Sequence, residues 1–325
     1  MAKLTLTVSG VQAETAVIRS VILTPAHNEP LPAFSAGAHL KVRIPGQAEP
    51  RCYSLVCLEP DSDLFSAPTR YCLGIRLEEP STGGSQYMHQ LKAGDALEVE
   101  GPKNDFPLHG AEPGEPPAVL IAGGIGITPI ASMAATLKAQ GRPFQLHYYG
   151  RSREQMSFVA ALAHHYGDAL HIHADDDPAT QLPLSLLLEQ TDTAQHLYVC
   201  GPKGLIDAVV EQSHGKQWPH SHIHFEVFAN AAPQAGDHGF EVQLSQSGQV
   251  FYVPAGKTIL QVLEEAGCDP MYDCRRGECG VCQVAVLEGA PDHRDHYLSD
   301  AERAAGNVMQ ICISRSHSDR LVLDL

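Results

Sequence analysis

A chain of 325 residues is too long for one ordinary hydrophobic core, so its length predicts two or three domains. Hydrophobic residues make up 43% of the sequence and charged residues 18%, a globular composition that excludes a disordered chain. The formal net charge of -16 disfavours nucleic acid as a partner, because phosphates require a basic surface.

No apolar run has the length that a membrane helix needs, and the stretch MAKLTLTVSG lacks the apolar centre of a signal peptide. We therefore expect a cytoplasmic protein with no membrane partner, and we take it as a monomer. Cysteines rarely form structural disulfides in a reducing cytoplasm. Clustering among the nine cysteines would therefore indicate metal or redox chemistry.

The first hundred residues predict short strands. Apolar and polar residues alternate with a period of two at residues 40–44 and 71–77. Further strands are expected at residues 4–8, 16–23, 53–56 and 97–99. Six short strands predict a small antiparallel β-barrel, to which we assign residues 1–110.

From residue 117 the pattern changes to apolar strands that alternate with helical stretches. This alternation predicts an α/β domain, a parallel sheet with helices on both faces, to which we assign residues 111–228. The expected strands are AVLIAGG, FQLHYYG, ALHIHAD, HLYVCGP and HIHFEVF. The first helix is expected to begin at a Thr128 cap, with Pro129 in its first turn. Its apolar stripe would be Ile130, Met133, Ala134 and Leu137.

The small, polar and turn-prone stretch at residues 229–239 is interpreted as a linker, and residues 240–325 as a third domain. This domain opens with a hairpin pattern, FEVQLSQSGQVFYVP. Capping boxes predict two helices in it, one at Thr258 with Gln261 and one at Ser299 with Glu302.

Four cysteines form the most specific pattern in the chain. Cys274, Cys279 and Cys282 have the spacing CxxxxCxxC, and Cys312 follows after a long gap. This is the plant-type ferredoxin spacing for a two-iron, two-sulfur cluster. Glycines at 277 and 280 would let backbone amides turn toward the sulfurs. A structural zinc site is the alternative, although zinc ligands usually come as two short-spaced pairs.

Two segments of the barrel could hold a phosphate. RCYSL, residues 51–55, ends a predicted strand and offers the cation of Arg51. Thr82, Gly83, Gly84 and Ser85 precede a short predicted helix, SQYMHQL, whose first backbone amides could face an anion. An ordinary loop before a capped helix would look the same.

Further motifs fall at the carboxyl ends of the predicted parallel strands, where nucleotides bind in such sheets. GGIGITP follows the first strand, and its glycines Gly123, Gly124 and Gly126 would let a ligand approach the backbone. Cys200, Gly201 and Pro202 end the fourth strand, and Glu226 and Phe228 end the fifth. Each motif has a simpler explanation when it is taken alone. The glycines could form a tight turn, Cys200 could be a buried core cysteine, and Phe228 could be a core aromatic residue.

The order of barrel, nucleotide sheet and C-terminal ferredoxin resembles the phthalate dioxygenase reductase family, a branch of the ferredoxin–NADP reductase superfamily. The resemblance covers essentially the whole chain and implies an α+β, β-grasp-like fold for the third domain. The matching stretches are RCYSL, STGGS, NDFPL, IAGGIGITP, YVCGP, HFEVF, CRRGECGVC, GAPDHRDHYLSD, ICISRS and LVLDL.

The resemblance implies a set of cofactor contacts. FMN would be held by Arg51, Cys52, Tyr53, Ser54, Arg76, Gly83, Gly84 and Ser85, and by Thr128 and Phe228 from beyond the barrel. Family members often carry a hydroxyl at position 52, so only a backbone contact is expected from Cys52. NADH would dock at residues 123–128 and 200–202. Ser54, Cys200 and Glu226 would face the reacting rings and are the candidate catalytic residues.

The function that the resemblance implies is the reductase component of an oxygenase system. Electrons would pass from NADH through FMN and the 2Fe–2S cluster, one at a time, to a terminal Rieske-type oxygenase. A reductase for a di-iron hydroxylase is one alternative, but such reductases usually carry the ferredoxin at the N-terminus. A plain electron carrier is another, but it would not need the first two domains.

Three questions stay open at this point. FAD could replace FMN, and the substrate of the oxygenase is not encoded in this chain. NADPH could replace NADH, because Arg151 and Arg153 could bind a 2′-phosphate. Three aspartates at residues 175–177 add negative charge at the next strand end and favour NADH.

Overall fold

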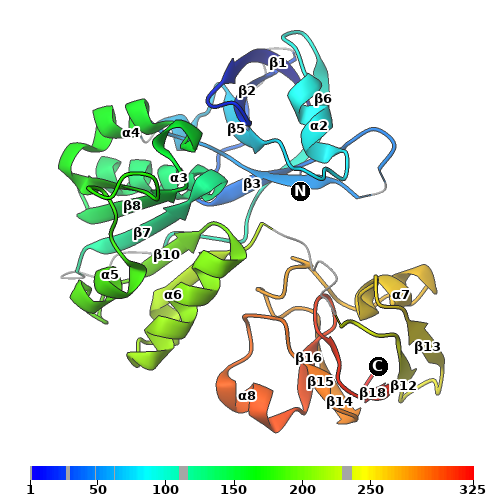
Figure 1. Ribbon diagram of the computed structural model, residues 1–325. Coiled ribbons are helices and arrows are strands. Elements are labelled where there is room, and N and C mark those ends of the chain that lie inside the picture. Colours follow the sequence, from blue (N-terminus) through cyan, green and yellow to red (C-terminus); the bar gives the residue numbers. More distant parts are fainter. Residues whose placement is uncertain (1, 27–29, 48, 62, 110–115, 229–235) are drawn as a thin grey trace. The chain divides into compact units, whose positions relative to one another are not determined.

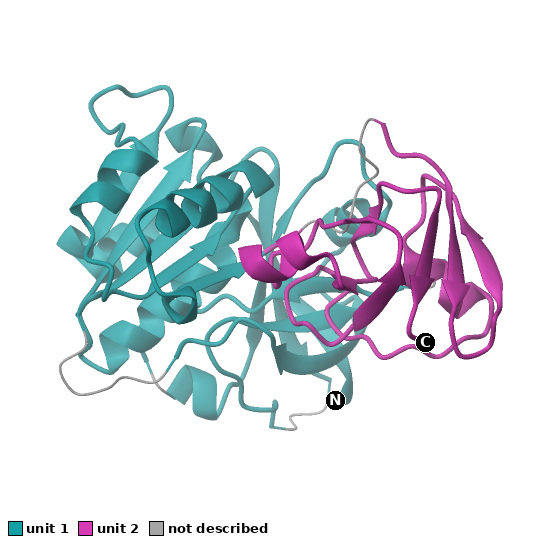
Figure 2. Ribbon diagram, turned by 90° about the horizontal axis from the view of Figure 1, so that it is seen from below, with its two compact units in different colours: residues 1–226 teal, residues 227–325 magenta. Residues whose placement is uncertain are grey.

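A computed structural model describes residues 2–26, 30–47, 49–61, 63–109, 116–228 and 236–325. The chain divides into two compact units, Met1–Glu226 and Val227–Leu325 (Figure 2). Residues 229–235 of the predicted linker lie outside the described residues. Val227 and Phe228, which the sequence assigned to the nucleotide domain, belong to the second unit. No helix in the described ranges is both long and apolar enough to cross a membrane.

Six antiparallel strands form the first sheet of unit 1, in the order β4-β3-β6-β1-β2-β5 (Figure 1). An antiparallel bridge between Leu55 and Leu73 joins the two edges of this sheet, so it curls into the predicted barrel. The strands are β1 Lys3–Ala13, β2 Ile18–Pro25, β3 Ala38–Val42, β4 Arg51–Ser54, β5 Tyr71–Arg76 and β6 Ala96–Asn104. Two short helices, α1 Asp63–Ser66 and α2 Gly84–Gln90, lie between them.

Five parallel strands form the second sheet of the same unit, in the order β11-β10-β7-β8-β9. They are β7 Ala118–Gly123, β8 Phe144–Gly150, β9 Leu170–Ala174, β10 Leu197–Cys200 and β11 Ile223–Glu226. The helices α3 Ile127–Ala139 and α4 Val159–Tyr166 pack on one face, and α5 Leu184–Gln190 and α6 Lys203–Gly215 on the other (Figure 1). The strand order reverses between β7 and β10, the position where such sheets bind ligands.

The first helix of this sheet differs from the prediction. It begins at Ile127, and its N-cap is Gly126 rather than Thr128. A 3-10 turn at Gly124–Gly126 runs directly into the helix, so Thr128 lies inside the first turn and donates to the Ile125 carbonyl at 3.0 Å. The predicted apolar stripe covers only part of the buried surface of α3. The helix is buried around nearly its whole circumference, between the sheet and the barrel.

The helical stretch after the second strand of this sheet also predicts a helix near residues 154–164, and the helix found there is shorter. A 3-10 turn at Arg153–Gln155 comes first, and α4 begins only at Val159.

Unit 2 contains a mixed five-stranded sheet, in the order β13-β12-β18-β14-β16. Its strands are β12 Phe240–Leu244, β13 Val250–Val253, β14 Gln283–Glu288, β16 Val308–Gln310 and β18 Arg320–Leu323, and a small ladder joins β15 Pro291–Asp292 to β17 Arg315–Ser316. The predicted hairpin is β12 with β13. Both predicted capping boxes form, at α7 Ile259–Glu265 and α8 Asp300–Ala305.

One buried hydroxyl joins the two sheets of unit 1. Ser132, in the middle of α3, donates to the Leu55 carbonyl at 2.7 Å and accepts from the Cys57 amide at 2.8 Å. Its side chain is completely buried. Residues 55–57 directly follow β4, so the helix of the nucleotide sheet is hydrogen-bonded to the edge of the barrel.

We expect Ser132→Ala to destabilise unit 1 by about 2 kcal/mol, because it leaves a buried amide and a buried carbonyl without their partner. The single tryptophan, Trp218, is buried in unit 1, so its fluorescence can follow the denaturation of that unit. Ser185→Ala, at an exposed position of α5, is the matched control and should change stability by less than about 0.5 kcal/mol. Equal effects of the two substitutions would contradict the role given to Ser132.

Candidate functional site

The carboxyl ends of β7, β10 and β11 are level with one another. Cys200 pairs in register with Ala122 on one side and with Glu226 on the other. Both Cys200 and Glu226 are buried. The structure therefore brings together two of the three candidate catalytic residues with the glycine turn that follows β7.

Two backbones meet at this edge. A Cβ on Gly126 would overlap the carbonyl group of Cys200, and a Cβ on Gly201 would lie 3.0 Å from the Cα of Gly123. Only glycine fits such an approach, because any side chain would push the two turns apart. The paired turns leave backbone rather than side chain at the sheet edge, which is the surface that a nucleotide needs.

Tyr148 of β8 supports the first turn. Its hydroxyl donates to the Gly124 carbonyl at 3.1 Å and accepts from the Ser157 amide at 3.1 Å. Burial raises the pKa of Tyr148 to about 12, so the phenol stays neutral and remains a donor. Sequence reasoning missed this residue, because an apolar strand pattern does not show which tyrosine reaches the turn.

The same end of α3 contacts the barrel. A Cβ on Gly74 of β5 would lie 2.6 Å from Cγ2 of Thr128 and 3.4 Å from the ring of Phe158. Ser54, the third candidate catalytic residue, is buried at the end of β4, next to the bridge between Leu55 and Leu73. The seam of the barrel thus faces the helix that begins at the nucleotide edge.

A second group of polar residues surrounds Arg51. Its Nη2 donates to Thr82 Oγ1 at 3.3 Å, and a Cβ on Gly84 would lie 2.9 Å from its Cγ. The buried Nε of Arg51 has no hydrogen-bond partner among the residues that the structure describes. A guanidinium held against a glycine turn with an unused N–H fits the phosphate group of a flavin.

Two residues that the sequence did not single out shape this turn. Gln47 donates from Nε2 to the Thr82 carbonyl at 2.7 Å. Ser81 Oγ accepts from the Gly83 amide at 3.0 Å and lies 3.0 Å from Ser85 Oγ. The contacts of Ser81 are local, whereas the contact of Gln47 could not be found from a local pattern, because Gln47 comes from a loop that is distant in the sequence.

The remaining flavin candidates have different environments. Tyr53 is half-buried, and burial raises its pKa to about 12 although the nearby Arg51 charge acts in the opposite direction. Cys52 and Arg76 are exposed. Phe228 is exposed and belongs to the second unit, so its place over a flavin stays a prediction.

In unit 2 the four candidate cluster ligands gather. The thiol of Cys274 is hydrogen-bonded to those of Cys279 and Cys312, and the thiol of Cys282 to that of Cys312. These contacts lower the pKa of Cys274 and of Cys282, which accept the hydrogen bonds, and raise the pKa of Cys279 and of Cys312, which donate them. Thiolates are the form that binds iron. In the described part of the chain, no three His, Cys, Asp or Glu side chains form a site for a single metal ion.

Polar contacts that the sequence did not predict surround these thiols. The Arg276 amide donates to Cys274 Sγ at 3.3 Å. The thiol of Cys282 lies 3.4 Å from Oε1 of Gln310, which is fully buried. Arg276 and Glu278 also hold the backbone of Val227, with Arg276 donating to its carbonyl at 3.3 Å and Glu278 accepting from its amide.

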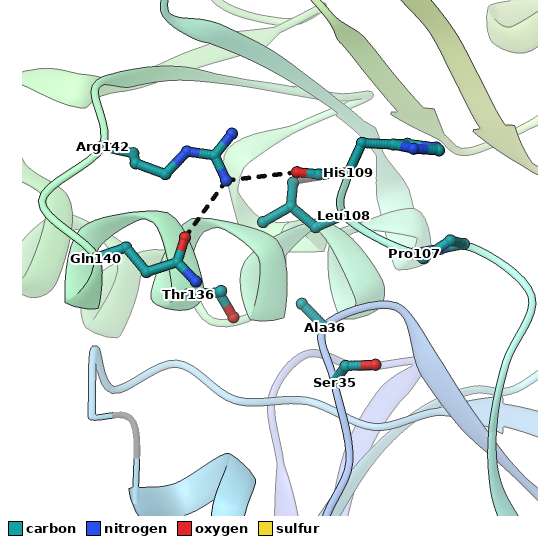
Figure 3. A pocket seen from close by; sticks show the side chains of 8 residues that line it. All are labelled: Ser35, Ala36, Pro107, Leu108, His109, Thr136, Gln140 and Arg142. Atoms are coloured by element: carbon teal, nitrogen blue, oxygen red, sulfur yellow. Dashed lines mark hydrogen bonds between the residues drawn. The ribbon is translucent and has the colours of Figure 1, made fainter. Parts of the chain in front are cut away.

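A cavity of about 270 Å³ lies elsewhere in unit 1, at the C-terminal end of α3 (Figure 3). Arg142 at its rim donates to the His109 carbonyl at 3.4 Å and to Gln140 Oε1 at 3.3 Å. Thr136 and Leu108 also line it. The nucleotide edge is at the opposite end of the same helix, so this cavity is separate from it.

The fold and these sites define an iron–sulfur oxidoreductase with a pyridine-nucleotide domain. Residues 120–211 match the model of the oxidoreductase NAD-binding domain, and residues 242–317 match that of the 2Fe-2S iron-sulfur cluster binding domain. The second match favours the two-iron cluster over the zinc alternative.

Relatives cover the whole chain. Vanillate O-demethylase oxidoreductase of Acinetobacter baylyi is 38% identical over 96% of this chain and 95% of its own length. The solved structure of phthalate dioxygenase reductase is 37% identical, covers 100% of this chain and 98% of its own, and has a TM-score of 0.72. This chain belongs to the phthalate dioxygenase reductase family.

A further solved structure shows the same arrangement inside a larger protein. Full-length CYP116B46 from Tepidiphilus thermophilus is 33% identical over 99% of this chain, with a TM-score of 0.74. The present chain spans 42% of that protein.

Family membership confirms the predicted fold, the oxidoreductase class and the expected cofactor set of FMN, 2Fe–2S cluster and NADH. The individual residues that hold these cofactors stay predictions.

We expect Gly126→Ala to weaken NADH binding by at least about tenfold, or 1.4 kcal/mol, because the new methyl group overlaps the Cys200 carbonyl and separates the two turns. The KM for NADH in dye reduction measures this. Gly204→Ala is the control: it lies in nearby α6, and a Cβ there meets no atom within 4 Å. If both variants bind NADH as the unchanged protein does, the close approach of the two turns is not needed for nucleotide binding.

Proposed function

We propose that this protein is the NADH-dependent reductase component of a Rieske-type oxygenase system, and that it passes electrons singly to the terminal oxygenase. The observation that carries the proposal is the coexistence in one chain of a nucleotide edge, a cationic flavin cradle and four gathered thiols. When bound, FMN supplies the exchange of two electrons with NADH, and the cluster supplies transfer of one electron at a time.

The side chains bind and orient rather than exchange protons. Arg51 and Thr82 would hold the flavin phosphate, and Tyr53, whose pKa is raised by burial, would pack against the ring as a neutral phenol. Cys200 and Glu226 occupy the sheet edge where the nicotinamide would lie, and Ser54 faces it from the barrel seam. Both Cys200 and Glu226 are buried at this edge.

The choice of NADH rests on charge at the strand ends. The amide of Asp175 donates to the Gly150 carbonyl at 2.9 Å, which fixes the aspartate turn of residues 175–177 beside the end of β8. Negative charge at that position would repel a 2′-phosphate. Arg151 and Arg153 follow β8, and both are exposed.

The partner is inferred from the relatives. The vanillate and phthalate proteins are named as the oxidoreductase and the reductase of oxygenase systems, which supports a separate oxygenase as acceptor. The similarity to CYP116B46 makes a cytochrome P450 the second candidate acceptor. The monomeric state and the cytoplasmic location expected from the sequence remain part of this proposal.

Arg51→Ala should yield a protein with little bound flavin. A charge-assisted hydrogen bond contributes about 1.5–3 kcal/mol, so the dissociation constant of FMN should rise about 10- to 150-fold. Flavin released on dilution, followed by fluorescence, measures it. Arg43→Ala removes an exposed barrel arginine that pairs with Glu98 and should leave flavin content unchanged. Full flavin retention by Arg51→Ala would show that another residue binds the phosphate.

Cys279→Ser tests whether electrons run in series through the cluster. Loss of one thiolate should break the cluster and leave the flavin in place. NADH-driven reduction of a two-electron dye should then continue, while reduction of cytochrome c or of the oxygenase falls to background. Cys268→Ser, in the same unit but outside the ligand pattern, should retain both activities. If Cys279→Ser still drives the oxygenase at the full rate, the flavin serves the partner directly and the serial path is wrong.

A further inference from the structure

A short segment of unit 2, residues 294–298, packs on both glycines of the cluster loop. A Cβ on Gly277 would lie 3.0 Å from Cα and Cβ of Asp295, and a Cβ on Gly280 would overlap the ring of Tyr297. The His296 amide also donates to the Gly277 carbonyl at 3.1 Å. The segment thus lies against the ligand loop at two places, one between Cys274 and Cys279 and the other between Cys279 and Cys282.

The buried carboxylate of Asp295 holds this segment in shape. Its Oδ2 accepts from the amides of Leu298 at 2.9 Å and Tyr297 at 3.2 Å. Its Oδ1 accepts from Ser314 Oγ at 3.1 Å, and Ser314 lies two residues beyond the ligand Cys312. The guanidinium of Arg303 donates to the Asp295 carbonyl and lies 3.8 Å from Oδ2. The segment is therefore fixed independently of any cofactor.

Tyr297 is placed differently from its neighbours. One part of its ring packs on Gly280, and 49% of the residue remains exposed. Gly280 has a φ of +74°, so neither the backbone nor the space at this position admits another residue. The tyrosine ring covers Gly280, which lies between the ligands Cys279 and Cys282.

We propose that Tyr297 is a positioning residue for the iron–sulfur cluster, and that its ring, fixed through Asp295, limits access of water to the cluster and thereby sets its reduction potential. The proposal rests on the proposed function in one respect, namely that the four cysteines hold the cluster. The ring atoms nearest to Gly280 are Cζ and the two Cε carbons, all of which a phenylalanine at position 297 would keep.

The direction of the effect follows from charge. Four thiolates around two irons make the centre anionic, and reduction adds one more negative charge. Water stabilises the more highly charged state better than a covered site does. Removing the ring should therefore make the cluster easier to reduce and raise its potential.

The experiment is a redox titration of the full-length protein with bound cofactors, followed by the electron paramagnetic resonance signal of the reduced cluster. We expect Tyr297→Ala to shift the equilibrium toward the reduced cluster at least threefold, a rise of about 28 mV at 59 mV per tenfold change for one electron. Tyr297→Phe should match the unchanged protein, and Tyr297→Leu should lie between. If Tyr297→Ala cannot retain its cluster, Tyr297→Leu provides the same measurement with a smaller expected shift.

Tyr252→Ala is the matched control. Tyr252 lies on β13, at the opposite edge of the sheet from β16, and it packs on Gly239 much as Tyr297 packs on Gly280. Its removal should leave the potential unchanged. An unchanged or lowered potential in Tyr297→Ala overturns the inference, as does a Tyr297→Phe variant that behaves like Tyr297→Ala. Absence of any cluster signal from the unchanged protein would instead contradict the proposed function.

Discussion

The contact between Gly126 and the Cys200 carbonyl is the constraint on which unit 1 depends. It brings the turn after β7 against the turn after β10 and so decides where α3 can begin. Since the helix starts at the sheet edge and is buried along its length, its position also decides where the barrel can pack. One close approach between two backbones thus determines how the nucleotide edge, the central helix and the flavin barrel are placed.

Unit 2 solves a different physical problem, since its ligands lie in a loop and not at the ends of regular strands. Three thiols within nine residues require a backbone that turns sharply, and the short ladders nearby offer few hydrogen bonds to hold it. Part of the support comes from the segment of residues 294–298, where the His296 amide donates to the Gly277 carbonyl. The buried carboxylate of Asp295 fixes that segment by accepting from two amides and from Ser314. A charged group in the interior is tolerated here because its oxygens have partners and a guanidinium lies close.

Local signals predicted local features correctly. The capping boxes at Thr258 and Ser299 both form, because each needs only residues three apart in one turn. The six barrel strands follow from a period of two. The Thr128 cap was wrong, because a 3-10 turn and not a side chain starts α3. Gln47, Tyr148 and Gln310 were missed for a related reason: each acts on a segment far from it in the sequence, and one residue's identity does not reveal that partner.

Two of the contacts between α3 and the barrel are made by residues four apart in the helix. Thr128 packs on Gly74 of β5, and Ser132 is hydrogen-bonded to the chain that leaves β4. Four residues of α-helix rise about 6 Å. This one turn of helix therefore fixes the distance of the two edge strands of the barrel from the end of the parallel sheet. Adding or removing one residue inside it would rotate one contact away by about 100°, so this stretch cannot change in length as surface loops can.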